Sequence, residues 1–380
     1  MKSHKEQRAS LAQVSSFRLK RHHLAQRQSS DIVAICGDVC GVQAQVMGSA
    51  ELALWARAHS LSRQDVRFAL WQKRSLVKTS AMRQTLHLLP ASEYHLYIAA
   101  LKQSRMEALL RIMARIDVGS KEMAAMTAAL MKILGDDPVP QGELAEQVKP
   151  HISRKLQASM KLFWNNWPIF RPGIIEGLIC YGPNRGRETT FVRVERWLGE
   201  RKTISETDAK QFLLQHYLRA YGPATLRDFS RWSGIPMKEA KPIWDSLQRE
   251  LIEISIEGTK ASLLRDDGPE LEETPPSRGM VRLLPAFDPY MLAHAEKGHL
   301  VHERHYKRVY RNQGWLSPVI LLDGRVVGVW SAKRSGKRVS LETEFFQKIP
   351  RTALAEVERE IEKLVRFTTT KDSMEATNFQ

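Results

Sequence analysis

The chain has 380 residues, of which 58 are Lys or Arg and 42 are Asp or Glu, so its formal net charge is +16 at pH 7. A chain of this length is typical of about two to four domains. Hydrophobic residues make up 43% of the sequence and charged residues 26%, close to globular averages, which excludes a largely disordered chain. The positive balance indicates an anionic partner, and nucleic acid is the first candidate because neutralised phosphates release counterions.

No apolar run reaches the roughly 18 residues that a membrane helix needs, and the basic start of the chain lacks the apolar segment of a secretory signal. We therefore expect a cytoplasmic, nucleoid-associated protein with no membrane partner. Cys36 and Cys40 lie four residues apart, whereas Cys180 stands alone. A metal site would need a second pair of ligands at close spacing, and the sequence contains none. We expect buried thiols in a reducing compartment and no metal site.

A helical pattern followed by two short strands around a polar turn occurs three times along the chain. The first set comprises helices within 30–73 and a hairpin over 75–89 with its turn at Ser80 and Ala81; the second comprises helices over 123–134 and 143–163 and a hairpin over 177–194.

The third set has the clearest boundaries. A helix that ends at a Gly-Pro pair, 222–223, is followed by one with Thr225 as N-cap and Asp228 at the third position of an approximate capping box. Gly234 breaks this helix, and Gly258 lies in the turn of the hairpin that follows.

Helix, turn, helix and a two-stranded ribbon form the plan of the winged helix, whose second helix commonly lies in a DNA groove. Three such sets in one basic chain favour a nucleic-acid-binding protein. Winged helices also serve as protein-docking scaffolds, so an RNA-binding or protein-docking module stays open on the pattern alone.

After the third set, an acidic, proline-rich linker is predicted over 266–276. Short strands follow over 281–284, 318–322, 326–330 and 339–341, and an amphipathic helix spans about 351–367. Asp323-Gly324 is a strong hairpin signal between two of these strands. The predicted fold class is α+β and mainly helical, with winged helices over 10–117, 118–202 and 203–266 and a small β-rich domain over 279–370.

Two features of the sequence are candidates for function. Gln43 and Gln45 lie in an apolar, small-residue segment near the start of a predicted helix. Amides carry no proton for acid–base work, so spacing alone indicates structural or surface glutamines. The second feature is a basic run that is either a phosphate-facing surface or a plain solvated face; its cations are Arg304, Lys307, Arg308 and Arg311.

Five motifs occur in a fixed order along the chain. They are Gly41-Val-Gln-Ala-Gln, Leu76-Val-Lys-Thr-Ser-Ala-Met-Arg-Gln-Thr-Leu-His, Tyr217-Leu-Arg-Ala-Tyr-Gly-Pro-Ala-Thr with Asp228-Phe-Ser-Arg-Trp-Ser-Gly, Leu284-Pro-Ala-Phe-Asp-Pro-Tyr, and Asp323-Gly-Arg-Val-Val-Gly-Val-Trp. Together they resemble the winged-helix DNA glycosylase family of AlkZ and YcaQ, over about residues 17–367.

The resemblance implies tandem winged helices that form a C-shaped clamp on duplex DNA. It also implies excision of N-alkylated purines, with interstrand crosslinks as substrates of some members. The family's catalytic motif is Gln-x-Gln in the AlkZ branch and Gln-x-Asp in the YcaQ branch, and Gln43 and Gln45 match the first.

The first hairpin departs from the family pattern, which usually has Arg-Gly-Thr where this chain has Arg83-Gln84-Thr85. Thr85 and His87 still align. We expect this hairpin to stand beside the glutamines and to contact DNA through Lys78, Arg83, Thr85 and His87. The alternative for His87 is that strand alternation leaves it merely solvated.

The expected reaction needs little help from a general base, that is, from a side chain that accepts a proton. Alkylation at purine N7 or N3 makes the base cationic and weakens its glycosidic bond, and Gln43 and Gln45 could position water and present carbonyl dipoles to the developing positive charge. No metal or other cofactor is implied. Because no Schiff-base lysine stands beside the glutamines, we expect a monofunctional hydrolase, although Lys78 could overturn this. We also expect the protein to be a monomer. The alternative is a non-catalytic DNA-binding or regulatory protein.

Overall fold

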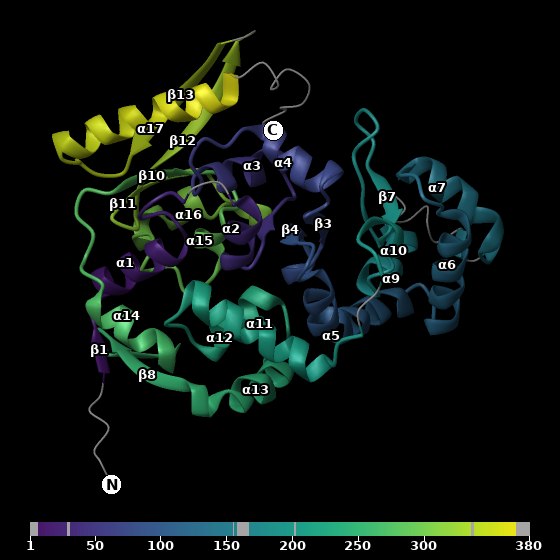
Figure 1. Cartoon of the computed structure of the whole chain (residues 1–380). Coiled ribbons are helices and arrows are strands. Elements are labelled where there is room, and N and C mark those ends of the chain that lie inside the picture. Colours follow the sequence, from purple (N-terminus) through teal and green to yellow (C-terminus); the bar gives the residue numbers. More distant parts are fainter. Residues whose placement is uncertain are drawn as a thin grey trace. The chain divides into compact units, whose positions relative to one another are not determined.

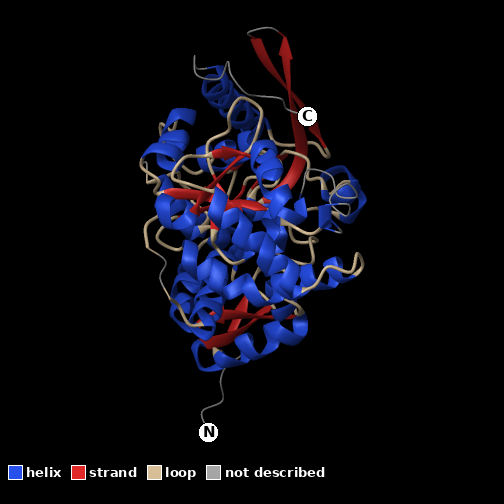
Figure 2. Cartoon of the chain, turned by 90° about the vertical axis from the view of Figure 1, so that its right-hand side faces the viewer, coloured by secondary structure: helices blue, strands red, loops and turns tan. Residues whose placement is uncertain are grey.

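The computed structural model describes residues 7–28, 31–154, 156–157, 167–200, 203–335 and 338–369. The fold is α+β and mainly helical, with strands between the helices (Figure 2). Internal contacts divide the chain into two compact units: unit 1 combines residues 1–67 with 214–380, and unit 2 consists of residues 68–213, coloured blue to teal in Figure 1. In the described part of the chain, no helix is long and apolar enough to cross a membrane.

Unit 1 is formed by the two ends of the chain. Two sheets lie within it, with the strand orders β1-β8-β9 and β10-β11-β12-β13. Its helices and strands are β1 (Gln7–Ala9), α1 (Leu11–Arg21), α2 (Ile32–Asp38), β2 (Val42–Gln43), α3 (Met47–Trp55), α4 (Arg63–Arg67), the end of α11 (Glu206–Tyr221), α12 (Leu226–Ser233), α13 (Met237–Ser246), β8 (Leu251–Ile256), β9 (Thr259–Leu264), α14 (Gly268–Glu273), β10 (Val281–Leu284), α15 (Pro289–Leu292), α16 (Tyr306–Val309), β11 (Val319–Leu322), β12 (Arg325–Ser335), β13 (Arg338–Phe345) and α17 (Arg351–Thr369).

Unit 2 is the middle of the chain, and its strands lie in the order β4-β3-β6-β7-β5. Its elements are the π-helix η1 (Phe68–Gln72), β3 (Leu76–Ser80), the 3-10 turn η2 (Met82–Gln84), β4 (Leu86–Pro90), α5 (Tyr94–Ala114), α6 (Ser120–Ile133), β5 (Val139–Pro140), α7 (Gln141–Val148), the 3-10 turn η3 (Lys149–His151), α9 (Trp167–Ile175), β6 (Ile179–Tyr181), β7 (Thr190–Arg193), α10 (Val194–Trp197) and the start of α11.

The third predicted set of elements is present, from α11 to the β8–β9 hairpin. The capping box is confirmed: the Asp228 amide donates to Thr225 Oγ1 at 3.2 Å, and the Thr225 amide donates to Asp228 Oδ2 at 2.9 Å. Gly234 ends α12 with φ 81°, a left-handed conformation that glycine adopts without a steric penalty. Strand β1 adds to the hairpin by pairing parallel to β8.

The predicted acidic linker is wrong over its first half, where the chain forms α14. Leu271 of this helix is buried in a small core with Val14 and Phe17 of α1. Arg21 pairs with Asp267 at 2.7 Å and with Glu270, so the acidic residues face a cation instead of solvent alone. A composition typical of loops is overridden here by packing and charge pairing from a distant segment.

The C-terminal strands and helix follow the prediction. Asp323 and Gly324 have φ values of 51° and 83°, as a tight hairpin turn with two left-handed residues requires. The indole of Trp330 donates to the Leu284 carbonyl at 3.0 Å, and α17 packs on β10 and β13. The buried Glu360 of α17 receives two hydrogen bonds from Arg27, at 3.0 and 2.6 Å.

In unit 2 the two predicted hairpins are present as β3–β4 and β6–β7. The helix predicted over 143–163 is observed only at its start, because α7 ends at Val148. Residues 155 and 158–163 lie outside the described part of the chain. The division between the units falls inside the predicted segment 10–117. The four-segment organisation, and the identity of each set as a winged helix, stay predictions.

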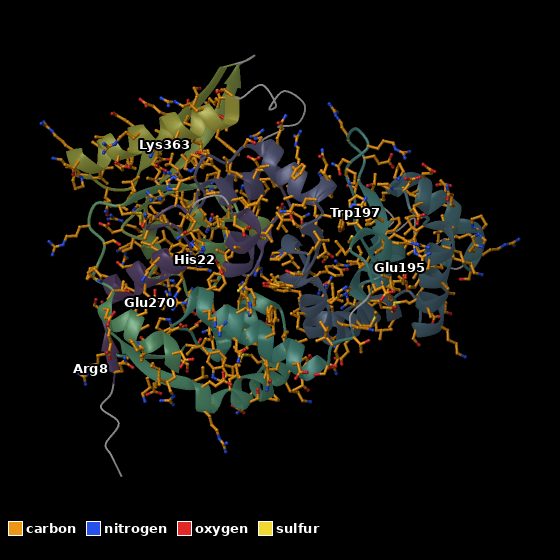
Figure 3. The ribbon with its side chains drawn as sticks, viewed as in Figure 1. Arg8, His22, Glu195, Trp197, Glu270 and Lys363 are labelled. Carbon is orange, nitrogen blue, oxygen red and sulfur yellow. The ribbon has the colours of Figure 1, made fainter. Side chains whose placement is uncertain are left out.

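A fully buried ion pair lies in unit 1. Arg57 donates to both carboxylate oxygens of Asp288, at 2.8 and 2.7 Å, and both side chains have no exposed surface. His22, labelled in Figure 3, lies among these side chains with its Nδ1 3.4 Å from Arg57. Burial, and then the charge of Arg57, hold the pKa of His22 well below its usual value, so this histidine is neutral.

Arg57→Met is expected to lower the free energy of unfolding by about 3–5 kcal/mol, because it leaves the buried Asp288 charge without its partner. Lys241→Ala is the control: it breaks the solvent-exposed Lys241–Asp245 pair and should change stability little. Urea unfolding of both variants provides the measurement. If Arg57→Met lowers the free energy of unfolding no more than Lys241→Ala does, the expected cost of leaving Asp288 unpaired is wrong.

Candidate active site

The Gln-x-Gln segment connects α2 to α3 in unit 1. After α2, Cys40 and Gly41 adopt φ values of 55° and 85°, which turn the chain into the short strand β2. Gln43 ends β2 and is 7% exposed, whereas Gln45 is exposed, two residues before α3 begins at Met47. The expected position near the start of a helix is confirmed.

The carboxylates that flank this segment in sequence are engaged with basic side chains. Asp38 lies 2.7 Å from His23 Nε2, and the buried Glu51 of α3 lies 3.3 Å from Arg63 Nε. Burial raises the pKa of Glu51, against the opposite effect of Arg63 and Arg67. Within residues 40–46 the polar side-chain groups that could meet a substrate are the two amides.

The β3–β4 hairpin of unit 2 has a longer turn than the predicted Ser80-Ala81 pair. The Ala81 amide donates to the Thr85 carbonyl at 3.0 Å, which closes a loop over 81–85. Arg83 and Gln84 occupy the left-handed region, with φ values of 52° and 62°. The Thr85 hydroxyl donates to the Met82 carbonyl at 3.1 Å, so it stabilises the turn from within.

His87 is buried, so the alternative of a merely solvated histidine is wrong. Its Nδ1 lies 2.9 Å from the Thr85 carbonyl, which can only accept, so Nδ1 carries the proton. Burial, and then the charge of Arg83, lower the pKa of His87 to about 3. Simple strand alternation, which would bury Leu86 and Leu88 and expose His87, does not hold here: Leu88 is buried but Leu86 is only half-buried.

Lys78 occupies the centre of β3, opposite Leu88 and Tyr181. Its ammonium lies 5.8 Å from the centroid of the Tyr181 ring. Burial lowers the pKa of Lys78, which favours the neutral amine that a Schiff base requires. Lys78 therefore remains the residue of this hairpin on which a lyase activity would depend.

Two arginines that the sequence did not single out support the hairpin turn. Arg105 of α5 donates to the Ser80 carbonyl at 2.7 Å and to its hydroxyl at 2.8 Å. Arg171 of α9 donates to Gln84 Oε1 at 2.6 Å. Burial, and then Arg171, lower the pKa of Arg105 to about 10. Their spacing in sequence gives no signal of this role, because the contacts join distant elements.

The basic run in unit 1 is exposed around α16, but its four cations differ. Arg308 forms an ion pair with Glu344, and its guanidinium lies 4.9 Å from the centroid of the Phe346 ring. Arg304 Nε lies 2.8 Å from His305 Nε2. Within the described part of the chain Arg304, Lys307 and Arg311 have no ion pair, and Lys307 and Arg311 also have no side-chain hydrogen bond, so we take these two as the candidates for a phosphate contact.

Comparisons with known proteins agree on one family. The profile of the family described as DNA glycosylase AlkZ-like matches residues 37–367. The interstrand DNA cross-link repair glycosylase of Streptomyces sahachiroi is 32% identical over 332 residues, which cover 85% of this chain and 88% of the relative. The solved structure of the S. sahachiroi DNA glycosylase AlkZ matches with a TM-score of 0.84 and 30% identity, over 95% of this chain and 97% of that one.

Stability between pH 6.5 and 3 is expected to depend on His87. Below pH 6.5 the unfolded chain binds a proton at this histidine while the folded chain does not, so the free energy of unfolding falls as the pH falls towards about 3. His87→Gln should remove this contribution, at most about 1.4 kcal/mol per pH unit. Urea unfolding at several pH values tests this prediction, and His151→Gln, at an exposed histidine, is the control. If the free energy of unfolding depends on pH in the same way in His87→Gln and in wild type, the pKa of His87 is not lowered in the folded state.

Proposed function

Because the chain belongs to the AlkZ-like family of DNA glycosylases, we propose that it hydrolyses the N-glycosidic bond of N-alkylated purines in duplex DNA, N7-alkylguanine above all. Interstrand crosslinks through such purines are a further substrate in this proposal, supported by the name of the S. sahachiroi relative, an interstrand DNA cross-link repair glycosylase. The observation that carries the proposal is the placement of Gln43 and Gln45 directly before α3, with no carboxylate in their segment.

The proposed reaction proceeds through an oxocarbenium-like transition state at the sugar. The cationic base is already a good leaving group, so the site has to hold a water molecule and stabilise positive charge on the sugar. The amide oxygens of Gln43 and Gln45 supply dipoles for both tasks. A general base typically contributes about 10²–10⁴-fold, and a site without one should spare uncharged, normal bases.

The finer features of the proposal concern DNA and the mode of cleavage. The chain acts as a monomer in the cytoplasm, associated with the nucleoid, and its tandem winged helices close on duplex DNA as a C-shaped clamp. The hairpin residues Lys78, Arg83, Thr85 and His87 lie on the DNA side of unit 2 or support it. The enzyme is monofunctional and leaves an abasic site. A non-catalytic DNA-binding protein is the alternative that an excision assay separates from it.

Gln45→Ala is expected to slow single-turnover excision of N7-methylguanine by about 10²–10³-fold. The reason is that the loss of one positioned dipole removes about 2.7–4 kcal/mol of transition-state stabilisation. Gln43→Ala should have a similar or milder effect. Both should bind the duplex nearly as tightly as wild type. Alkali treatment converts the abasic product into a strand break that can be counted on a gel.

The exposed Gln248→Ala provides a matched control, since it removes an amide from unit 1 outside the proposed site. It should excise at the wild-type rate. Wild-type rates in both Gln43→Ala and Gln45→Ala would exclude the glutamines as catalytic residues and favour the non-catalytic alternative.

Duplex binding is expected to weaken steeply with salt and to show little sequence preference. Each phosphate contact contributes about −0.9 to the slope of log K against log salt concentration. Lys307→Ala and Arg311→Ala should each reduce the slope by about that amount, whereas Arg308→Ala should reduce it less because Arg308 pairs with Glu344. Fluorescence anisotropy at several salt concentrations measures the slopes; an unchanged slope in the first two variants would place the DNA elsewhere.

A further inference from the structure

The backbone turn that leads into Gln43 begins at Val39, the residue that caps α2. The Cys40 amide donates to the Gly37 carbonyl and the Gly41 amide to the Cys36 carbonyl, both at 2.8 Å. Because Cys40 and Gly41 then adopt left-handed conformations, the orientation of the peptide unit after Val39 sets the direction in which the chain enters β2.

The carbonyl of Val39 receives a hydrogen bond from a distant side chain. The hydroxyl of Tyr221, at the end of α11, donates to it at 2.8 Å, and both residues are buried. They lie 182 positions apart in the sequence. A buried carbonyl without a partner is costly, so this hydroxyl both satisfies the group and fixes its direction.

Tyr221 is itself held from several sides. Its ring centroid lies 4.9 Å from that of His22 and 5.3 Å from that of Tyr217. Its carbonyl accepts a hydrogen bond from His294 Nε2 at 3.0 Å. Burial holds the pKa of His294 well below its usual value, so this contact comes from a neutral imidazole. The hydroxyl of Tyr221 is therefore a fixed point in the core of unit 1.

We propose that Tyr221 is a positioning residue for base excision: its hydroxyl holds the Val39 turn so that Gln43 and Gln45 meet the substrate in the productive orientation. The proposal rests on the catalytic role given above to the glutamines. Catalysis by positioned dipoles is sensitive to geometry, and a displacement of about 1 Å can reduce a rate by about 10². DNA affinity, which depends on phosphate contacts, should not depend on this hydroxyl.

Tyr217 offers a matched control. It lies one turn earlier in α11, is equally buried, and also donates its hydroxyl to a backbone carbonyl, that of Ala293 at 3.1 Å. Tyr221→Phe and Tyr217→Phe thus each remove one buried hydroxyl and keep the ring. We expect Tyr221→Phe to slow single-turnover excision of N7-methylguanine by about tenfold or more, and Tyr217→Phe by less than about twofold. The Kd for the duplex should be unchanged in both.

Two further measurements report on the turn directly. Hydrogen exchange followed by mass spectrometry should be faster over residues 39–46 in Tyr221→Phe and unchanged there in Tyr217→Phe. Gly41→Ala leaves Tyr221 intact but disturbs the same turn, because alanine is strained at φ 85°. It should reproduce slow excision with normal DNA affinity even if Tyr221→Phe proves too unstable to assay.

Equal excision rates in the two tyrosine variants, or unchanged exchange over residues 39–46, would overturn the positioning role. If Gln43→Ala and Gln45→Ala are inactive at the same time, the proposed function stands and only this inference fails. Full excision by both glutamine variants would instead overturn the proposed function, and the positioning role with it.

Discussion

The buried pair of Arg57 and Asp288 anchors the far end of α3, the helix that follows the proposed site. Arg57 follows α3, which begins two residues after Gln45, and its guanidinium also donates to the Ala53 carbonyl within that helix at 2.8 Å. Asp288 in turn caps α15 by accepting from the Tyr290 amide at 2.9 Å. A pair of charges that far from water is stable only in a fixed geometry, so it ties the end of α3 to the segment between β10 and α15.

On the N-terminal side of Gln43 and Gln45, the chain is anchored by a neutral contact, the hydrogen bond from the Tyr221 hydroxyl to the Val39 carbonyl. The glutamine segment is thus short, carries its own left-handed turn at Cys40 and Gly41, and lies between two points fixed in the core of unit 1. In the proposed reaction the two neutral amides have no charge with which to attract a substrate, so their orientation has to supply most of their effect. Rigid attachment at both ends is a physical basis for that orientation.

Local chemistry explains which parts of the fold could be predicted. The capping box at Thr225, the stop at Gly234 and the turn at Asp323-Gly324 are set by residues within a few positions, and each is present. Contacts between distant segments explain the failures. Leu271 packs on α1 and turns a predicted linker into α14, and spacing gave no sign that Arg105 holds the turn after β3. The glutamine pair itself came from resemblance to a family, since two amides at this spacing would otherwise indicate only structural residues.

A site built on two amides should distinguish its substrate by the charge of the nucleobase. The most direct measurement compares single-turnover release of N7-methylguanine with that of O6-methylguanine from the same duplex. The first base is cationic and leaves readily; the second is uncharged and needs more help to leave. We predict release of N7-methylguanine and no detectable release of O6-methylguanine. Comparable rates for the two bases would contradict it, because they would require acid–base assistance that these glutamines cannot give.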